Sequence, residues 1–187
     1  MHLYLPVKNQ DAIIMVQLDF LDGKTMKTLL LLRHAKASPD QPGLHDHDRP
    51  LNKRGKKDAP KVGKYLKEND LIPDLILSST ARRAHDTARA VAEESGFSGE
   101  ISLHQDLYMS DMDCYIDILR CLPDEANRVL IVGHNPDLEG FLTLLTDVTQ
   151  HLVTAALAQV DLPISSWQEL SEATDGRLQN LWSPRQE

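Results

Sequence analysis

The most regular pattern in the chain is an apolar run that ends abruptly in polar residues. Leu29–Leu32 are four consecutive leucines, and they stop at Arg33 and His34. Such a run is typical of a strand buried on both faces, as in a parallel sheet covered by helices on both sides. We therefore predict a strand over residues 28–33. Arg33 and His34 should lie at the rim of the sheet, where open α/β sheets bind ligands.

A second buried strand is predicted over Leu75–Leu77. The hydroxyl residues Ser78–Thr80 that follow can cap a helix over residues 81–94. Arg82 and Arg83 fall in its first turn, where the helix dipole disfavours cations. Departures from local rules of this kind often mark functional sites. An anion held between these arginines and the helix N-terminus would resolve the conflict.

A third buried strand, over residues 129–132, leads to Gly133 and again ends in a histidine, His134. Asn135 is a good N-cap residue and Pro136 a good first helical residue, so a helix is expected from residue 137 to about 146. Strands joined by right-handed helical crossovers are parallel, so their carboxyl ends share one rim. The two histidines and the arginines can therefore meet there.

The remaining pattern completes an α/β fold: three layers, α/β/α, around a mostly parallel sheet. Asn52 should cap a helix running to about residue 69, with a kink or a later start at Pro60. Another helix should follow residue 113. Further strands are expected at 101–103, 152–162 and 177–182. Residues 26–187 are predicted to form a single domain. Residues 1–25 are an extension that could be an added edge strand, an upstream start artefact or, as we favour, a loosely attached arm, with a short strand possible at 13–20.

Composition narrows the function. The 187 residues are 41% hydrophobic and 26% charged, with a formal net charge of -8. This acidic balance argues against nucleic-acid binding, which requires a basic face. No run approaches the roughly 20 apolar residues of a membrane span, and no signal-peptide pattern opens the chain, so we expect a cytoplasmic protein. Cys114 and Cys121 lack metal-site spacing and are interpreted as packing residues. His45–Asp48 could suggest a metal site but is interpreted as a solvated loop.

The set of side chains at the predicted rim suits phosphoryl transfer. Arginine forks match phosphate oxygens. A neutral imidazole of His34 can attack phosphorus and form a phosphohistidine that water later hydrolyses. Nearby arginines would lower the pKa of His34 by like-charge repulsion and keep it neutral. His134, if protonated, could stabilise the charge of the transition state. This chemistry requires neither a metal nor a cofactor.

These residues resemble the histidine phosphatase superfamily, also called phosphoglycerate-mutase-like, over residues 27–184. Leu32-Arg33-His34-Ala35 is similar to its Arg-His-Gly signature, with Ala35 in place of glycine. Residues 79–87 resemble its Ser-x-x-x-Arg-Ala-x-x-Thr segment, which implies that Arg83 rather than Arg82 binds phosphate. Gly133-His134 is similar to the segment of the second histidine. The resemblance implies the phosphoglycerate-mutase-like fold.

Within this superfamily the chain looks most like the SixA phosphohistidine phosphatases. Residues 33–37, 48–55 and 133–136 carry that similarity. It implies substrate-binding roles for Arg49, as an extra phosphate contact, and for Asn52. Many branches carry a glutamate general acid soon after the third strand, but residues 107–110 contain none, as in SixA-like enzymes. Asp111 and Asp113 are possible substitutes. A phosphoramidate whose leaving nitrogen is already protonated needs a dedicated acid less.

The sequence therefore predicts a metal-independent phosphatase with His34 as nucleophile and with Arg33, Arg83 and His134 holding the phosphoryl group. The predicted substrate is phosphohistidine on a protein partner. Two alternatives stay open. One is a phosphatase of the same fold for a small phosphorylated metabolite. The other is a non-catalytic module that binds phosphate or a phosphoprotein.

Overall fold

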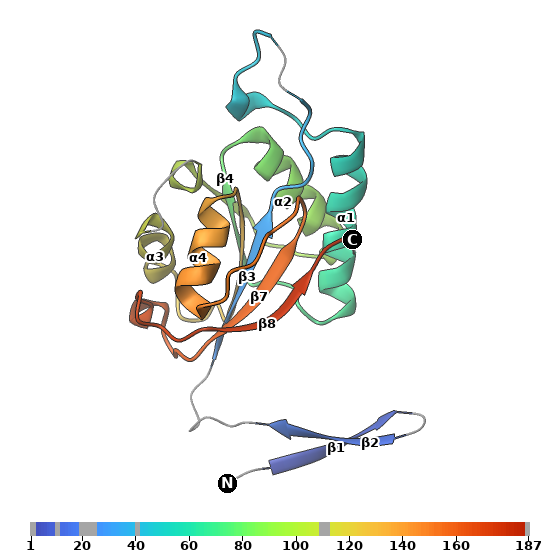
Figure 1. Cartoon of the computed structure of the whole chain (residues 1–187), viewed down its shortest axis with the longest axis vertical. Coiled ribbons are helices and arrows are strands. Elements are labelled where there is room, and N and C mark those ends of the chain that lie inside the picture. The colour runs from blue at the N-terminus through green and yellow to red at the C-terminus, as the bar shows by residue number, and fades with distance from the viewer. Residues whose placement is uncertain (1–2, 10–11, 19–25, 40–41, 109–112, 186–187) are drawn as a thin grey trace.

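The computed structural model describes residues 3–9, 12–18, 26–39, 42–108 and 113–185 (Figure 1). At its centre lies a six-stranded sheet with the strand order β5-β4-β6-β3-β7-β8. The bounds are Lys27–Arg33 (β3), Leu75–Ser79 (β4), Ile101–His104 (β5), Arg128–Gly133 (β6), Leu157–Leu162 (β7) and Arg177–Trp182 (β8). Strands β3 to β6 run parallel, while β7 pairs antiparallel with β3 and β8 antiparallel with β7. The predicted mostly parallel sheet is confirmed.

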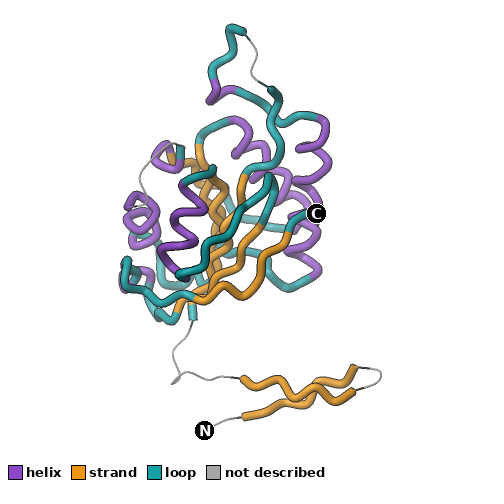
Figure 2. Tube along the Cα trace, viewed as in Figure 1, coloured by secondary structure: helices purple, strands orange, loops and turns teal. Residues whose placement is uncertain are grey.

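Helices cover both faces of this sheet (Figures 1 and 2). One face carries α1 (Lys53–Glu68) and α2 (Arg82–Ser95), and the other carries α3 (Asp113–Arg120) and α4 (Asp137–Thr146). The leucines of β3 alternate between the layers. Leu29 and Leu31 belong to the core with α3 and α4, whereas Leu30 and Leu32 belong to the core with α1 and α2. Because both faces of β3 are buried, the predicted three-layer α/β/α architecture is confirmed.

Helix α1 begins as predicted. The Asn52 side chain accepts a hydrogen bond from the backbone N–H of Gly55 at 2.9 Å. The helix then continues through Pro60, so the expected later start was wrong. The cap and the burial of Ala59 and Val62 keep this segment helical on both sides of the proline.

Two other helix starts differ from the prediction. Ala81 is the N-cap of α2 and has no side-chain cap. The hydroxyl of Ser79 instead accepts from the N–H of Ala81 itself, at 3.2 Å. At α4 the N-cap is Pro136. Asn135 does not cap this helix, because its amide donates to the Glu139 carboxylate and to the carbonyl of Leu152.

The N-terminal extension contains a β-hairpin of β1 (Leu3–Asn9) and β2 (Ala12–Leu18), which pair antiparallel as a separate two-stranded sheet. The strand considered within residues 13–20 is therefore present. The strand β1 was not predicted.

The two cysteines differ in their exposure to solvent. Cys114 is half-buried in α3, but Cys121 is exposed, so the packing interpretation was wrong for Cys121; α3 ends one residue before it, at Arg120.

Of the helices in the described ranges, none is long and apolar enough to cross a membrane.

Candidate active site

The carboxyl ends of β3, β4 and β6 bring three distant segments together at one rim. His34 follows β3, His134 follows β6, and Arg83 lies in the first turn of α2 after β4. The two imidazole ring centroids are 5.0 Å apart. The Nε of Arg83 lies 3.3 Å from Nε2 of His34. The rim therefore collects the side chains that the three strand ends were expected to deliver.

Hydrogen bonds at both ring nitrogens fix the orientation of His34. Its Nδ1 lies 2.8 Å from the carbonyl oxygen of Ala35, so Nδ1 carries the proton and donates it. The lone pair is then on Nε2, where it accepts a hydrogen bond from Nε of Arg83 at 3.3 Å. The pKa of His34 is lowered to about 4, chiefly by burial and also by the charges of Arg83, Arg33 and Arg49, against the opposing Ala35 hydrogen bond. The direction of this shift is the one predicted, but burial contributes more than like-charge repulsion.

His134 is buried beside it and is also neutral. Its Nε2 lies 2.9 Å from the hydroxyl of Ser79. Its pKa is lowered to about 3, chiefly by burial and then by repulsion from His34 and Arg83. The protonated form considered above is therefore disfavoured in this state. The Nδ1 atom is buried and has no hydrogen-bond partner among the described residues, so it is a polar atom that a phosphoryl oxygen or hydroxyl could satisfy.

Arg33 is anchored through a backbone carbonyl. Its Nη1 donates to the carbonyl oxygen of Leu152 at 2.7 Å. The N–H of Leu152 in turn donates to Oε1 of Glu139 at 2.8 Å. The Nε of Arg33 is buried and without a partner in the described part of the chain. One end of the guanidinium is thus fixed, and another donor remains for an oxyanion.

Asp46 contacts this site from a largely exposed loop, in agreement with the interpretation of residues 45–48 as a solvated loop. Its carbonyl accepts from Nη1 of Arg83 at 2.7 Å, and its Oδ2 accepts from Nη2 of Arg83 at 3.0 Å. Oδ1 accepts from Arg49 at 2.6 Å, and the Tyr108 hydroxyl donates to Oδ2 at 2.8 Å. Burial raises the pKa of Asp46, but the bonds from Tyr108 and Arg49 and the charge of Arg83 outweigh it and lower the pKa to about 2.

Asp46 and Tyr108 are the residues of this rim that the sequence analysis missed. One signal was available: the loop that contains Asp46 follows β3 directly at the carboxyl rim, where ligands bind. Tyr108 follows the short helix Gln105–Leu107 after β5, at the same edge. Its ring lies edge-on to His134, with centroids 5.5 Å apart.

A cavity of about 390 Å³ opens at the rim. Its lining residues are Arg33, His34, Lys36, Ala37, Pro39, Arg49, Asn52, Arg83 and Thr154. Both predicted substrate-binding residues are at its wall, but they differ. Arg49 donates through Nε and Nη2 to the carbonyl of Ser38, at 3.0 and 2.8 Å. The Asn52 amide is engaged on both sides, with Gly55 and with the carbonyl of Ala37, so its role here is mainly structural.

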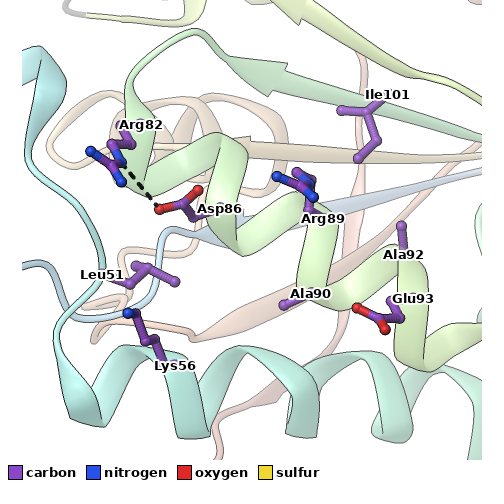
Figure 3. A pocket seen from close by; sticks show the side chains of 9 residues that line it. All are labelled: Leu51, Lys56, Arg82, Asp86, Arg89, Ala90, Ala92, Glu93 and Ile101. Atoms are coloured by element: carbon purple, nitrogen blue, oxygen red, sulfur yellow. Dashed lines mark ion pairs between the residues drawn. The ribbon is translucent and has the colours of Figure 1, made fainter.

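A larger hollow of about 600 Å³ lies beside α2 (Figure 3). Among the described residues that line it there is no imidazole, and its cations Lys56, Arg82 and Arg89 are interspersed with carboxylates. Arg82 lies at its edge, with Nε 3.8 Å from the Asp86 carboxylate. The neighbouring arginines of α2 thus have different surroundings: Arg82 is exposed in this hollow, whereas Arg83 is buried against His34.

The acid and metal candidates have little support. Asp113 is exposed at the start of α3, and Asp111 lies outside the described residues. Within the described ranges, no three His, Cys, Asp or Glu residues are grouped so that they could hold a metal ion, and His45–Asp48 forms no such group.

Comparison with known proteins gives consistent results. The family described as the histidine phosphatase superfamily (branch 1) matches residues 29–115. An uncharacterised chloroplastic protein of Arabidopsis thaliana is 33% identical over 171 residues, covering 84% of this chain and 78% of that protein. Two similar structures are proteins provisionally assigned as the phosphohistidine phosphatase SixA. The one from Nakamurella multipartitia has 26% identity and a TM-score of 0.75, covering 85% of this chain and 96% of its own. The one from Agrobacterium tumefaciens has 29% identity and a TM-score of 0.72, covering 84% and 98%.

Proposed function

The chain belongs to the histidine phosphatase superfamily, in its SixA-type branch, and on this basis we propose a metal-independent phosphatase that works through a covalent phosphohistidine at His34. The observation that carries the proposal is the state of the His34 ring. Its proton is held on Nδ1 by Ala35, and its Nε2 lone pair faces the buried guanidinium of Arg83. A neutral, oriented imidazole beside cationic donors is what attack on phosphorus requires.

The reaction has two steps. In the first, the Nε2 lone pair of His34 forms a bond to phosphorus, and the bond from phosphorus to the leaving group breaks, with its electron pair going to the leaving atom. In the second, water attacks the same phosphorus, the N–P bond breaks, and phosphate leaves while His34 recovers its lone pair. Arg33, Arg83 and His134 donate to the phosphoryl oxygens as charge develops. These cationic and polar donors take the electrostatic role that a metal has in other phosphatases.

We assign phosphohistidine on a protein partner as the substrate. None of the described residues that line the cavity carries a carboxyl group. The nearby Asp46 is ionised at neutral pH, because its pKa is lowered to about 2. A site without a protonated acid favours a leaving group that departs unaided. The imidazole of phosphohistidine, already protonated on its other nitrogen, leaves as a neutral ring.

A substrate panel tests this proposal. Phosphate release should be measured from a phosphohistidine peptide, a phosphoserine peptide and a sugar phosphate, with and without a chelator. We expect the phosphohistidine peptide to have a kcat/KM at least ~10-fold above the others, no effect of the chelator, and no turnover by His34→Ala. His45→Ala, at an exposed histidine of the loop, is the matched control. Preferred turnover of the sugar phosphate would favour the metabolite phosphatase. Phosphate binding without turnover of any substrate would favour a binding module.

A further inference from the structure

The hydrogen bonds of Arg83 divide its guanidinium into two edges. The edge formed by Nη1 and Nη2 is occupied by Asp46, through the backbone carbonyl at 2.7 Å and Oδ2 at 3.0 Å. On the edge that contains Nε, the Nε–H donates to Nε2 of His34 at 3.3 Å, so this donor lies beside the atom that would attack phosphorus. Since a guanidinium is planar and rigid, fixing one edge sets the direction of the other.

Asp46 is itself held from two further directions. Arg49 donates to Oδ1 at 2.6 Å, and the Tyr108 hydroxyl donates to Oδ2 at 2.8 Å. Its backbone belongs to the short helix Asp46–Asp48, so the carbonyl that binds Arg83 is part of a regular turn. The contact between Asp46 and Arg83 is therefore supported by side chains from both the loop and the far side of the rim.

We propose that Asp46 is a positioning residue, which holds the Nη1–Nη2 edge of Arg83 so that the Nε edge is presented to the phosphoryl group at His34. This inference rests on the proposed function. The opposite interpretation is that Asp46 blocks Arg83 and must leave before substrate binds. The geometry argues against it, because half of the contact is made by the main chain and because the Nε edge of the buried Arg83 already faces the nucleophile.

The two interpretations predict opposite changes in the rate of His34 phosphorylation when Asp46 is replaced, so substitution of Asp46 separates them. The rate of phosphorylation of His34 should be measured by rapid quench with the phosphoramidate ion as donor, in the wild type, Asp46→Ala and Asp46→Asn. We expect a fall of roughly 10- to 100-fold for Asp46→Ala and a smaller fall for Asp46→Asn, because a misplacement of about 1 Å costs on that order. The inhibition constant of inorganic phosphate should change less than ~3-fold. A misplaced Arg83 would weaken phosphate binding, but the loss of a neighbouring negative charge favours anion binding and offsets this.

Asp48→Asn is the matched control, because Asp48 lies in the same loop and its carboxylate lies 3.4 Å from the ring of His47. Tyr108→Phe should reproduce part of the fall by removing one support of Asp46. An unchanged or faster rate for Asp46→Ala, normalised to folded protein, would overturn the inference alone. Absence of phosphorylation in the wild type would overturn the proposed function as well.

Discussion

Acidification should destabilise this protein through the two histidines of the rim. The pKa of His34 is lowered to about 4 and that of His134 to about 3. In the unfolded chain both rings return to the ordinary value of about 6.5. Between these values the unfolded chain binds protons that the folded protein does not. Stability is therefore fully present above pH 6.5 and is lost as the pH falls toward the folded values.

The size of the effect follows from the shifts. At pH 5 the solution is about 1.5 pH units below the unfolded pKa of each ring. Each unit of this difference stabilises the unfolded state by about 1.36 kcal/mol. We expect a loss of ~1–2 kcal/mol for each histidine between pH 7 and pH 5, or ~2–4 kcal/mol for the pair. Urea unfolding at pH 7, 6 and 5 measures this directly. NMR titration of the two rings should show no protonation near pH 6.5.

Other titratable groups also contribute to the pH dependence of the unfolding free energy. A comparison of the wild type with a histidine variant removes their contribution. His134→Gln should flatten the dependence of unfolding free energy on pH by about half, whatever its effect on stability at pH 7. His45→Gln is the control, because it removes an exposed imidazole outside the buried pair. Equal slopes for His134→Gln and the wild type would refute the reasoning, as would a His34 ring that titrates near pH 6.5.

Two further substitutions test the walls of the cavity. Arg49→Ala should raise the KM for a phosphohistidine peptide by roughly 10-fold, and Arg49→Lys should not restore it, because an ammonium lacks the guanidinium fork; an unchanged KM would exclude Arg49 from substrate binding. Gly55→Ala should lower the unfolding free energy by ~1–3 kcal/mol in urea titrations, because its Cβ would lie 2.2 Å from the carbonyl oxygen of Lys36. A fully stable Gly55→Ala protein would show that α1 can move away from Lys36 without a loss of unfolding free energy.

The fold could be predicted because its signals are local. The leucine run of β3 alternates between two cores, and similar apolar runs form β4 and β6. The N-cap residues of α2 and α4, Ala81 and Pro136, were not predictable from capping propensity. At α4 the Asn135 side chain is used by Glu139 and Leu152, which is a tertiary contact. Tertiary partners override the preference of an isolated helix end.

The site was predictable as far as strand ends determine it. Parallel strands deliver His34, His134 and Arg83 to one rim, and topology alone requires this. Asp46 and Tyr108 were not predictable, because their contacts span 37 residues to Arg83 and 62 residues between themselves. No periodicity or spacing encodes such a contact. The exposure of this loop was predicted from its polar composition, but composition does not show which exposed carboxylate binds an arginine of the site.

If His34 is the nucleophile, it is the residue that carries the phosphoryl group during turnover. Protein quenched within milliseconds of mixing with a phosphohistidine peptide or phosphoramidate should be digested at neutral to alkaline pH and analysed by mass spectrometry. We expect a phosphoryl group on Nε2 of His34, formed and lost at rates consistent with kcat, and absent in His34→Asn. Turnover with the phosphoryl group on another residue, or undiminished turnover by His34→Asn, would contradict it.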